Sequence, residues 1–237
     1  MWPCLIVAIL SIIFLSPLIV SVVTPLAGTQ VSQPVQEHVE QAIRIALESA
    51  TQRRNLALIQ DGARAIPRLT TPNDSGPAPE GALQSLDFRR PSCWSFPGNH
   101  GQLGIRLSRK VIPTYIALDM AYPNPTEGKS HAPRHVIFWG VVDGDSNHAK
   151  YEKVLYENKD AVARYGTGPA QTLGYTFIVL ADFEYDGTSP FPLQAYRVAG
   201  PVVDAEMVFG VVVVEVRSNW GGERTAICGV RVHGEEV

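Results

Sequence analysis

The feature that most constrains the fold of this chain is the dense β-type pattern that follows Cys93. About eight runs of β-branched and aromatic residues occur there, separated by clusters of Gly, Pro, Asn and Asp. No long helical pattern interrupts these runs, so the chain is predicted to be all-β, an antiparallel β-sandwich or jelly roll. The expected strands are Leu103–Leu107, Thr114–Leu118, Val136–Val142, Tyr151–Tyr156, Tyr175–Tyr185, Leu193–Val198, Met207–Val216 and Ile227–His233.

Two segments near the C-terminus predict how the last strands are arranged. The run from Val211 to Val214 shows no polar alternation, which indicates a central strand covered on both faces. The following segment, Arg217 to Gly222, has the composition of a hairpin turn into the last strand.

The N-terminal segment predicts a membrane anchor within residues 1–24. Leu5–Val23 contains no charged side chain, and the first charge in the chain is Glu37. This length is close to the thickness of the bilayer core, at about 1.5 Å per helical residue. A cleaved signal peptide is the alternative, but no Lys or Arg precedes the apolar run and the run is long for one. In either case, we expect the rest of the chain to lie in a lumen or outside the cell.

Residues 25–54 are expected to form a short lumenal stalk helix. Ser32 and Pro34 suit a helix start, and apolar residues from Val35 to Ala50 then recur every three or four positions. The helix either associates with copies of itself as a short coiled coil or packs on its own domain. The domain itself is expected over residues 55–237, with a Pro- and Gly-rich loop over 70–92. Within that loop, Asn73 begins an Asn-Asp-Ser triplet that fits a glycosylation acceptor.

Composition excludes some classes of function and leaves the cysteines open. The net charge of -3 gives no footprint for binding nucleic acid, and 45% hydrophobic content suits a buried core. Three cysteines are too few for a disulfide scaffold. In an oxidising compartment, Cys93 and Cys228 are able to pair with each other or with a partner chain.

No motif in the sequence indicates catalysis. Asp143, Asp145 and Asn147 imitate the start of a calcium loop, but His148 stands where the loop needs glycine and Val154 where it needs glutamate. No nucleophile elbow, P-loop or dinucleotide fingerprint is present. We therefore expect a non-enzymatic module without a cofactor.

Six short sequence blocks, which occur in the family's order, make the chain resemble the SUN domain. This domain is the lumenal module of inner nuclear membrane proteins of the Sad1/UNC-84 family, and the sequence is most similar to fungal members. The blocks span Asn55 to Gly234. They are Leu56-Ala57-Leu58 with Gly62-Ala63 and Ile66-Pro67; Cys93-Trp94-Ser95-Phe96-Pro97-Gly98 with Gly101; Ile112-Pro113-Thr114; Ala132-Pro133-Arg134 with Trp139-Gly140; Val214-Glu215-Val216-Arg217-Ser218-Asn219-Trp220-Gly221; and Arg231-Val232-His233-Gly234.

The resemblance implies a fold, an assembly and a partner. The fold is a β-sandwich of the galactose-binding type, and the assembly is a homotrimer joined partly through the stalk. The partner is the C-terminal tail of a KASH protein, bound by strand addition between neighbouring protomers in the perinuclear space. Such a protein belongs to the LINC complex that links the nucleus to the cytoskeleton. A different class of function, an endoplasmic-reticulum module that binds a ligand or carbohydrate without bridging, shares the same fold.

The resemblance also assigns candidate partner-binding residues. Cys93 matches a family cysteine that, in some members, forms a disulfide with the KASH peptide; its alternatives are a bond to Cys228 or simple packing. Arg197 falls where members place a groove histidine, and Arg224 and Cys228 fall where they place groove tyrosines. Two arginines could donate paired hydrogen bonds to a carboxylate instead, or the peptide site is weakened or lost.

Two further loops complete the family comparison. The loop Ala121 to Ser130 matches the family loop that wraps a monovalent cation with backbone carbonyls, with Ala121, Asn124, Glu127 and Ser130 as positions along it. The segment before Cys93 is shorter than the β-hairpin lid that usually covers the bound peptide. A reduced lid implies weaker binding or a different partner.

Overall fold

The computed structural model describes residues 54–73, 78–84, 92–120, 129–158, 164–189 and 191–237. The anchor expected at Leu5–Val23 and the stalk helix within 25–54 lie outside the described residues, apart from Arg54. In the part of the chain that the structure describes, no helix is long and apolar enough to cross a membrane.

The elements are 3-10 helices η2 (Ile59–Asp61), η3 (Pro67–Leu69) and η4 (Pro79–Leu83); helices α4 (Asp145–Glu157) and α6 (Gly200–Asp204); and strands β1 (Arg64–Ala65), β2 (Trp94–Pro97), β3 (Gly101–Asp119), β4 (His135–Val142), β5 (Thr176–Glu184), β6 (Leu193–Arg197), β7 (Phe209–Val216), β8 (Arg224–Ile227) and β9 (Gly229–Glu236).

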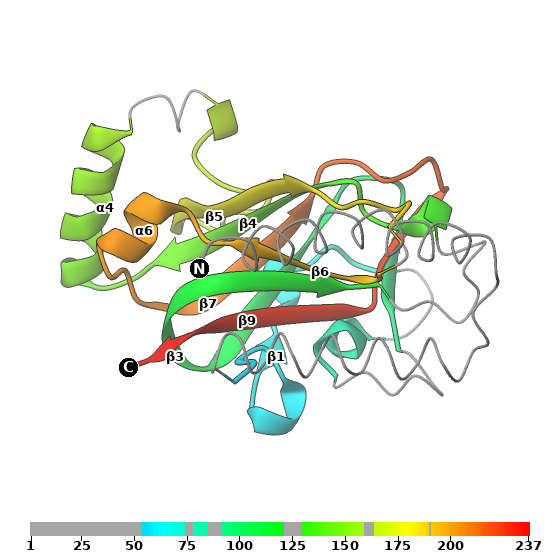
Figure 1. Cartoon of the computed structure of the whole chain (residues 1–237), viewed down its shortest axis with the longest axis horizontal. Helices are drawn as coiled ribbons and strands as arrows, with labels where there is room; N and C mark the ends of the chain where they lie inside the picture. Colours follow the sequence, from blue (N-terminus) through cyan, green and yellow to red (C-terminus); the bar gives the residue numbers. More distant parts are fainter. Residues whose placement is uncertain (1–53, 74–77, 85–91, 121–128, 159–163, 190) are drawn as a thin grey trace, which may run out of the picture. The chain divides into compact units, whose positions relative to one another are not determined.

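One long strand, β3, connects the two layers of the sandwich. Its first half pairs with β1 and β7, and β4 and β5 continue that sheet beyond β7. Its second half pairs instead with β6 and β9. The β3–β7 ladder shifts register between Arg106 and Val111, and the β3–β9 ladder shifts between Pro113 and Tyr115, where the strand passes from one layer to the other. Figure 1 shows β6, β3 and β9 side by side. The predicted all-β antiparallel sandwich is confirmed.

The valine run in β7 lies at the centre of its sheet, as its lack of alternation predicts. β7 pairs with β3 on one side and β4 on the other. Val212 and Val214 face the main core between the layers. Val213 faces a second apolar cluster on the opposite side, with Trp139 and Phe177. Both faces are buried because each has its own cluster, so a polar residue has no place in this run.

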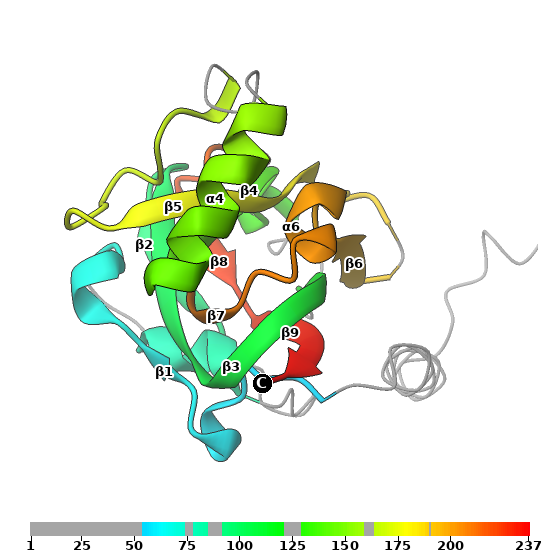
Figure 2. The same ribbon diagram turned by 90° about the vertical axis from the view of Figure 1, so that its left-hand side faces the viewer.

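The expected strand over Tyr151–Tyr156 is wrong, because this segment lies in helix α4. Its Tyr and Val residues favour a strand by composition, yet Tyr151, Val154 and Leu155 have helical spacing and share one side. The packing of this side of the helix and the hydrogen bonds of Asn147 override the local strand propensity. The Asn147 side chain donates to the carbonyl of Val208 and accepts from its backbone N–H. Figures 1 and 2 show α4 and α6 at the same end of the sandwich.

The expected hairpin into the last strand is also wrong. β7 and β8 do not pair; β8 pairs with β2 to form a separate two-stranded sheet. The expected final strand is interrupted at Cys228, after which β9 joins β3. The segment Arg217 to Gly222 therefore connects β7 in the larger sheet to β8 in the two-stranded sheet, and it is not a hairpin turn between two paired strands.

The start of the domain is held by its last strand. The backbone N–H of Leu56 donates to the carbonyl of Val232 at 2.9 Å. The side-chain oxygen of Asn55 accepts from the N–H of Val232 at 3.0 Å. Within the expected loop 70–92, η4 also packs on the core through Ala82 and Leu83, both fully buried.

Gly140 provides a test of the packing between the main core and β4. A Cβ atom added there would overlap the ring of Phe209, which is fully buried. We expect Gly140→Ala to lower the free energy of unfolding by about 1–3 kcal/mol, because a buried ring has little room to move. Urea denaturation measures the change. Gly200→Ala is the matched control, since its nearest heavy atom would be 3.9 Å away; equal stability of both variants with the parent would contradict this packing.

Candidate functional site

A disulfide joins the two cysteines that sequence reasoning singled out. Trp94 pairs opposite Ile227 in the β2–β8 sheet, so Cys93 and Cys228 are the next residues to face each other. Their sulfur atoms are bonded at 2.03 Å, and 135 positions separate them in the chain. Of the three alternatives open for Cys93, the structure contains the bond to Cys228.

The disulfide rests on the main core. Cys228 is fully buried within it, and Cys93 is partly buried against it. Next to it, Trp94 and Phe96 are also fully buried, with ring centroids 4.8 Å apart. The bond therefore fixes the β2–β8 sheet to the sandwich at the point where the aromatic side chains enter the core.

A buried ion pair follows directly after the disulfide. Asp119, the last residue of β3, lies opposite Gly229 in β9, and its carboxylate accepts a hydrogen bond from Arg231 at 3.1 Å. The Asp119 side chain is fully buried and that of Arg231 is only 9% exposed. Burial raises the pKa of the nearby Tyr185 hydroxyl, and the charge of Asp119 adds to the increase. This end of β3 is therefore a charged site inside the fold and not a solvated surface.

The sequence block that starts at Cys93 and the block that ends at Gly221 meet at one loop, and the side chain of Asn219 holds this loop together. The side-chain N–H groups of Asn219 donate to the carbonyls of Gly222 and Arg224 and to the hydroxyl of Thr225, at 2.9 to 3.1 Å. The Thr225 hydroxyl in turn donates to the carbonyl of Gly98 at 2.8 Å. The loop that leads into β8 is thus tied to the turn that follows β2.

The neighbouring Trp220 joins this loop to the Ala132-Pro133-Arg134 block. Pro133 bridges to Asn219, and the guanidinium of Arg134 lies 4.8 Å from the centroid of the Trp220 ring. The indole N–H of Trp220 donates to the carbonyl of Tyr185 at 3.2 Å. Two blocks that are far apart in the sequence therefore form a single packed unit.

The two candidate arginines lie on different sheets. Arg197 ends β6 with an exposed side chain, and its guanidinium is 5.6 Å from the ring centroid of Tyr115. Arg224 begins β8 opposite Pro97 and is partly buried. A carboxylate shared by both within one protomer is not suggested by this placement. Their roles stay predictions, since the expected groove involves two protomers.

The other predicted ligand positions are only partly described. Ala121, Asn124 and Glu127 lie outside the described residues. The carbonyl of Ser130 accepts the N–H of Gly222 at 2.9 Å. Asn73 is described, but the rest of its triplet is not. In the described ranges, no group of three or more His, Cys, Asp or Glu is placed to hold a metal ion.

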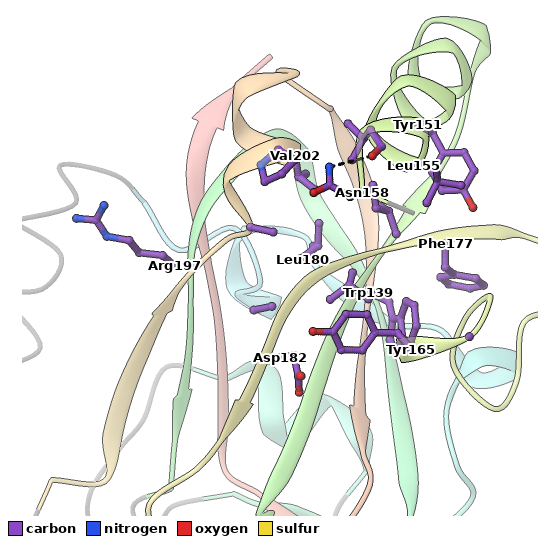
Figure 3. Close-up of a pocket in the computed structure, with 17 residues that line it drawn as sticks. Trp139, Tyr151, Leu155, Asn158, Tyr165, Phe177, Leu180, Asp182, Arg197 and Val202 are labelled. Carbon is purple, nitrogen blue, oxygen red and sulfur yellow. Dashed lines mark hydrogen bonds between the residues drawn. The ribbon is translucent and has the colours of Figure 1, made fainter. Parts of the chain in front are cut away.

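Sequence reasoning missed a pocket of about 360 Å³ between β5, α4 and α6 (Figure 3). Aromatic and aliphatic side chains dominate its lining, among them Trp139, Tyr151, Leu155 and Phe177. The pocket depends on α4, which composition alone reads as a strand. The spacing of Tyr151, Val154 and Leu155, after a first turn rich in Asp, Ser and Asn, is the signal that could have located it.

The polar end of this pocket is formed around Asp182. Its carboxylate is 2.7 Å from His135 Nε2 and 3.6 Å from the guanidinium of Arg164. Burial and then the charge of Asp182 raise the pKa of the Tyr165 hydroxyl beside it. In Figure 3, the Arg197 side chain points away from the pocket.

Comparison with known proteins gives a family match to part of the chain. Residues 75–165 match the family described as Sad1 / UNC-like C-terminal. SUN domain-containing protein 3 of Mus musculus is 35% identical over 66 residues, and that of Bos taurus 32% over 66 residues. These alignments cover 27% of this chain, and 21% and 18% of the respective relatives, so the chain matches about a fifth of their length.

A solved structure gives a likeness of fold. The family 32 carbohydrate-binding module of Streptococcus pneumoniae EndoD superposes with a TM-score of 0.50 at 12% identity. The superposition covers 77% of this chain and 100% of that one. At this identity the likeness shows the fold alone.

The disulfide gives a prediction on stability. Replacing both cysteines, Cys93→Ala with Cys228→Ala, should lower the free energy of unfolding by about 2–5 kcal/mol, because the bond closes a long loop in the unfolded chain. Chemical denaturation with and without a reducing agent measures the effect. Reductant should destabilise the parent by a similar amount and leave the double variant unchanged; a parent insensitive to reductant would contradict the bond.

The loop organised by Asn219 gives a second prediction. Asn219→Ala removes four hydrogen bonds, three donated and one accepted from the N–H of Gly221, at a site that is 9% exposed, and leaves partly or fully buried groups without their partner. We expect a loss of about 2–4 kcal/mol in the free energy of unfolding. Asn99→Ala is the control, because its hydrogen bond to His100 lies on the exposed surface. A cost for Asn219→Ala no larger than that of the control would show that the loop does not depend on this side chain.

Proposed function

We propose that this chain, a SUN domain protein by the match of residues 75–165, is a non-enzymatic adaptor of the nuclear envelope. Its domain would lie in the perinuclear space and bind the C-terminal tail of a KASH protein, linking the inner nuclear membrane to the outer one. The observation that carries the proposal is the family match, together with the relatives named SUN domain-containing protein 3.

The redox state of the cysteines supports a lumenal placement. Structural disulfides form and persist in oxidising compartments and are rare in the cytosol. In the bond between Cys93 and Cys228, the Cys228 side is fully buried, and the bond attaches the β2–β8 sheet to the sandwich. It therefore has the character of a structural disulfide. The predicted apolar anchor at Leu5–Val23 would place the domain in such a compartment.

The same bond limits one part of the family analogy. Cys93 is already bonded to Cys228, so a second disulfide from Cys93 to a KASH cysteine requires the first to open. We therefore propose that binding rests on non-covalent contacts. Arg197 is exposed at the end of β6, and Arg224 begins a strand of the two-stranded sheet. On separate protomers of a homotrimer, each could donate to the tail's carboxylate or backbone.

The alternative of a carbohydrate-binding module in the endoplasmic reticulum is not favoured. It would rest on structures whose likeness shows only the fold, and one fold hosts many ligands. The adaptor requires no catalytic residue or cofactor.

Pull-down with crosslinking from the native compartment tests the proposal directly. The full chain should recover a tail-anchored protein with a short lumenal C-terminus, and repeated absence of such a partner would contradict the adaptor function. Recovery of glycoproteins that free sugar elutes would favour the carbohydrate-binding alternative. The mass of the purified complex tests the homotrimer.

The recovered tail, made as a peptide, tests the arginines. Arg197→Ala and Arg224→Ala should each weaken binding by about tenfold, because a hydrogen bond to a charged group contributes about 1.5–3 kcal/mol. Arg106→Ala is the matched control, as an exposed arginine on β3. A peptide with an amidated C-terminus should bind the parent more weakly. Unchanged affinity in both arginine variants would remove the arginines from the site while leaving the adaptor proposal intact.

A further inference from the structure

A second hollow, of about 380 Å³, lies on the face of the larger sheet that carries the second apolar cluster. Leu69, Val141 and Val211 line it, and each of them belongs to that cluster or packs against it. Leu173 and Tyr175, in the turn before β5, complete the apolar part of the lining. The hollow therefore suits a ligand with an apolar portion.

Basic side chains line the same hollow. Arg68 of η3 and Lys110 of β3 stand there with Asp143 as the one carboxylate, and all three residues are exposed. Within the described ranges, none of the three takes part in an ion pair. Two positive charges and one negative charge leave a positive excess in the hollow itself, which favours an anionic group on the ligand.

A pair of arginines continues this positive charge next to the hollow. Arg64 of β1 lies directly opposite Arg106 of β3, and Arg106 lies opposite Val211, which lines the hollow. Residues that face each other in this way share one side of the sheet, and like charges at such positions weaken the strand pair. In the part of the chain that the structure describes, neither arginine forms an ion pair. An anion bound beside the hollow would relieve the repulsion.

The turn before β5 holds two apolar side chains in the solvent. Leu173 is 46% exposed and Tyr175 is 54% exposed. The N–H of Tyr175 donates to the carbonyl of Thr172 at 3.0 Å, and the φ angles of Leu173 and Gly174 are 52° and 80°. Positive φ at both central positions is typical of a type I′ turn, in which Asn, Asp or Gly is usual and a leucine is strained. Strain of this kind is found where a side chain has a function at the surface.

One buried side chain, that of Gln102, anchors both sides of the hollow to β3. Its Nε2 donates to the carbonyl of Leu69 at 3.0 Å and to that of Gln171 at 3.1 Å. Its Oε1 accepts from the N–H of Gln171 at 2.8 Å. Because Gln102 is only 1% exposed, these bonds are shielded from water. The wall formed by η3 and the wall formed by the turn are therefore fixed before any ligand binds.

The position of the predicted anchor favours a membrane lipid over other anions with an apolar portion. Residues 24–53 separate the anchor at Leu5–Val23 from Arg54. This segment would span about 45 Å as a helix and at most about 100 Å when extended. The strand β1 and the helix η3, which carry Arg64 and Arg68, follow soon after Arg54. The bilayer is thus within reach of the hollow, and exposed Leu and Tyr beside basic residues are typical of a surface that contacts lipid.

We propose that this hollow binds an anionic phospholipid of the membrane in which the chain is anchored. Arg68 and Lys110, with the Arg64–Arg106 pair beside them, contact the headgroup. The apolar lining and the turn before β5 contact the acyl chains. The site does not use the Cys93–Cys228 sheet or the arginines assigned to a KASH tail, so it stands or falls separately from the adaptor function.

Photocrosslinking of the full chain in lipid nanodiscs tests the site. The probe is a phosphatidylserine with a diazirine on one acyl chain, and mass spectrometry locates the label. The label should fall on the residues that line the hollow, within 66–69, 173–175 and 208–211. A phosphatidylcholine probe, which has no net charge, should label these residues at least about fivefold less, because each basic side chain near an anionic surface raises the affinity by about that factor.

A double variant tests the charge of the hollow. Arg68→Gln with Lys110→Gln should reduce labelling by phosphatidylserine about tenfold or more. Lys129→Gln with Lys153→Gln is the matched control, since it removes the same charge from exposed lysines that do not line the hollow, and it should be labelled like the parent.

Leu173→Gly separates lipid binding from stability. Glycine adopts the positive φ without strain, so the variant should resist urea at least as well as the parent. It lacks the apolar side chain, so labelling should fall about threefold or more.

The proposal is overturned if the two lipid probes label the hollow equally or if the label falls only elsewhere. Labelling of the Arg68 and Lys110 double variant, or of Leu173→Gly, at the level of the parent also overturns it. If the chain forms a dimer that Leu173→Gly converts to a monomer, this face is an interface between two copies and the proposal is wrong.

Discussion

Backbone pairing along β3 is the constraint on which the rest of the structure depends. Both layers of the sandwich contain this strand, the first layer through its N-terminal half and the second through its C-terminal half. A shift of one residue in either half would turn every side chain of that half to the wrong face. The register shifts around Val111 and Pro113 therefore fix how the two layers meet, and the core forms between them.

The features near Cys93 act together to close one end of this sandwich. The disulfide attaches the two-stranded sheet, the Asp119–Arg231 pair holds β9 to the end of β3, and Asn219 ties the connecting loop to the turn after β2. The strands β2 and β8 are too short to be stable alone, since four-residue strands contribute few hydrogen bonds. Covalent, ionic and hydrogen-bonded links therefore add to the stabilisation that β2 gains from the burial of Trp94 and Phe96.

Prediction from sequence succeeded where a pattern has one physical cause. The unbroken valines of β7 need burial on both faces, and only a central strand supplies it. Prediction failed where distant residues decide the outcome. Tyr151 and Val154 favour a strand locally, but packing and the link from Asn147 to Val208 make their segment a helix. Because the pocket needs that helix as a wall, it was missed together with the helix. For Cys93, the choice of partner depended on the register of β2 with β8, which no local pattern encodes.

The attachment of Asn55 and Leu56 to Val232 has a mechanical consequence. The chain enters the domain beside its final strand, and β9 is in turn paired with β3 along most of its length. Tension that arrives through residue 54 is therefore transmitted to β9 and also directly to β3, the strand that both layers share, because the backbone N–H of Ser108 donates to the Leu56 carbonyl at 2.9 Å. A pull from that side loads the middle of the sandwich directly, and no surface loop has to yield before the core resists.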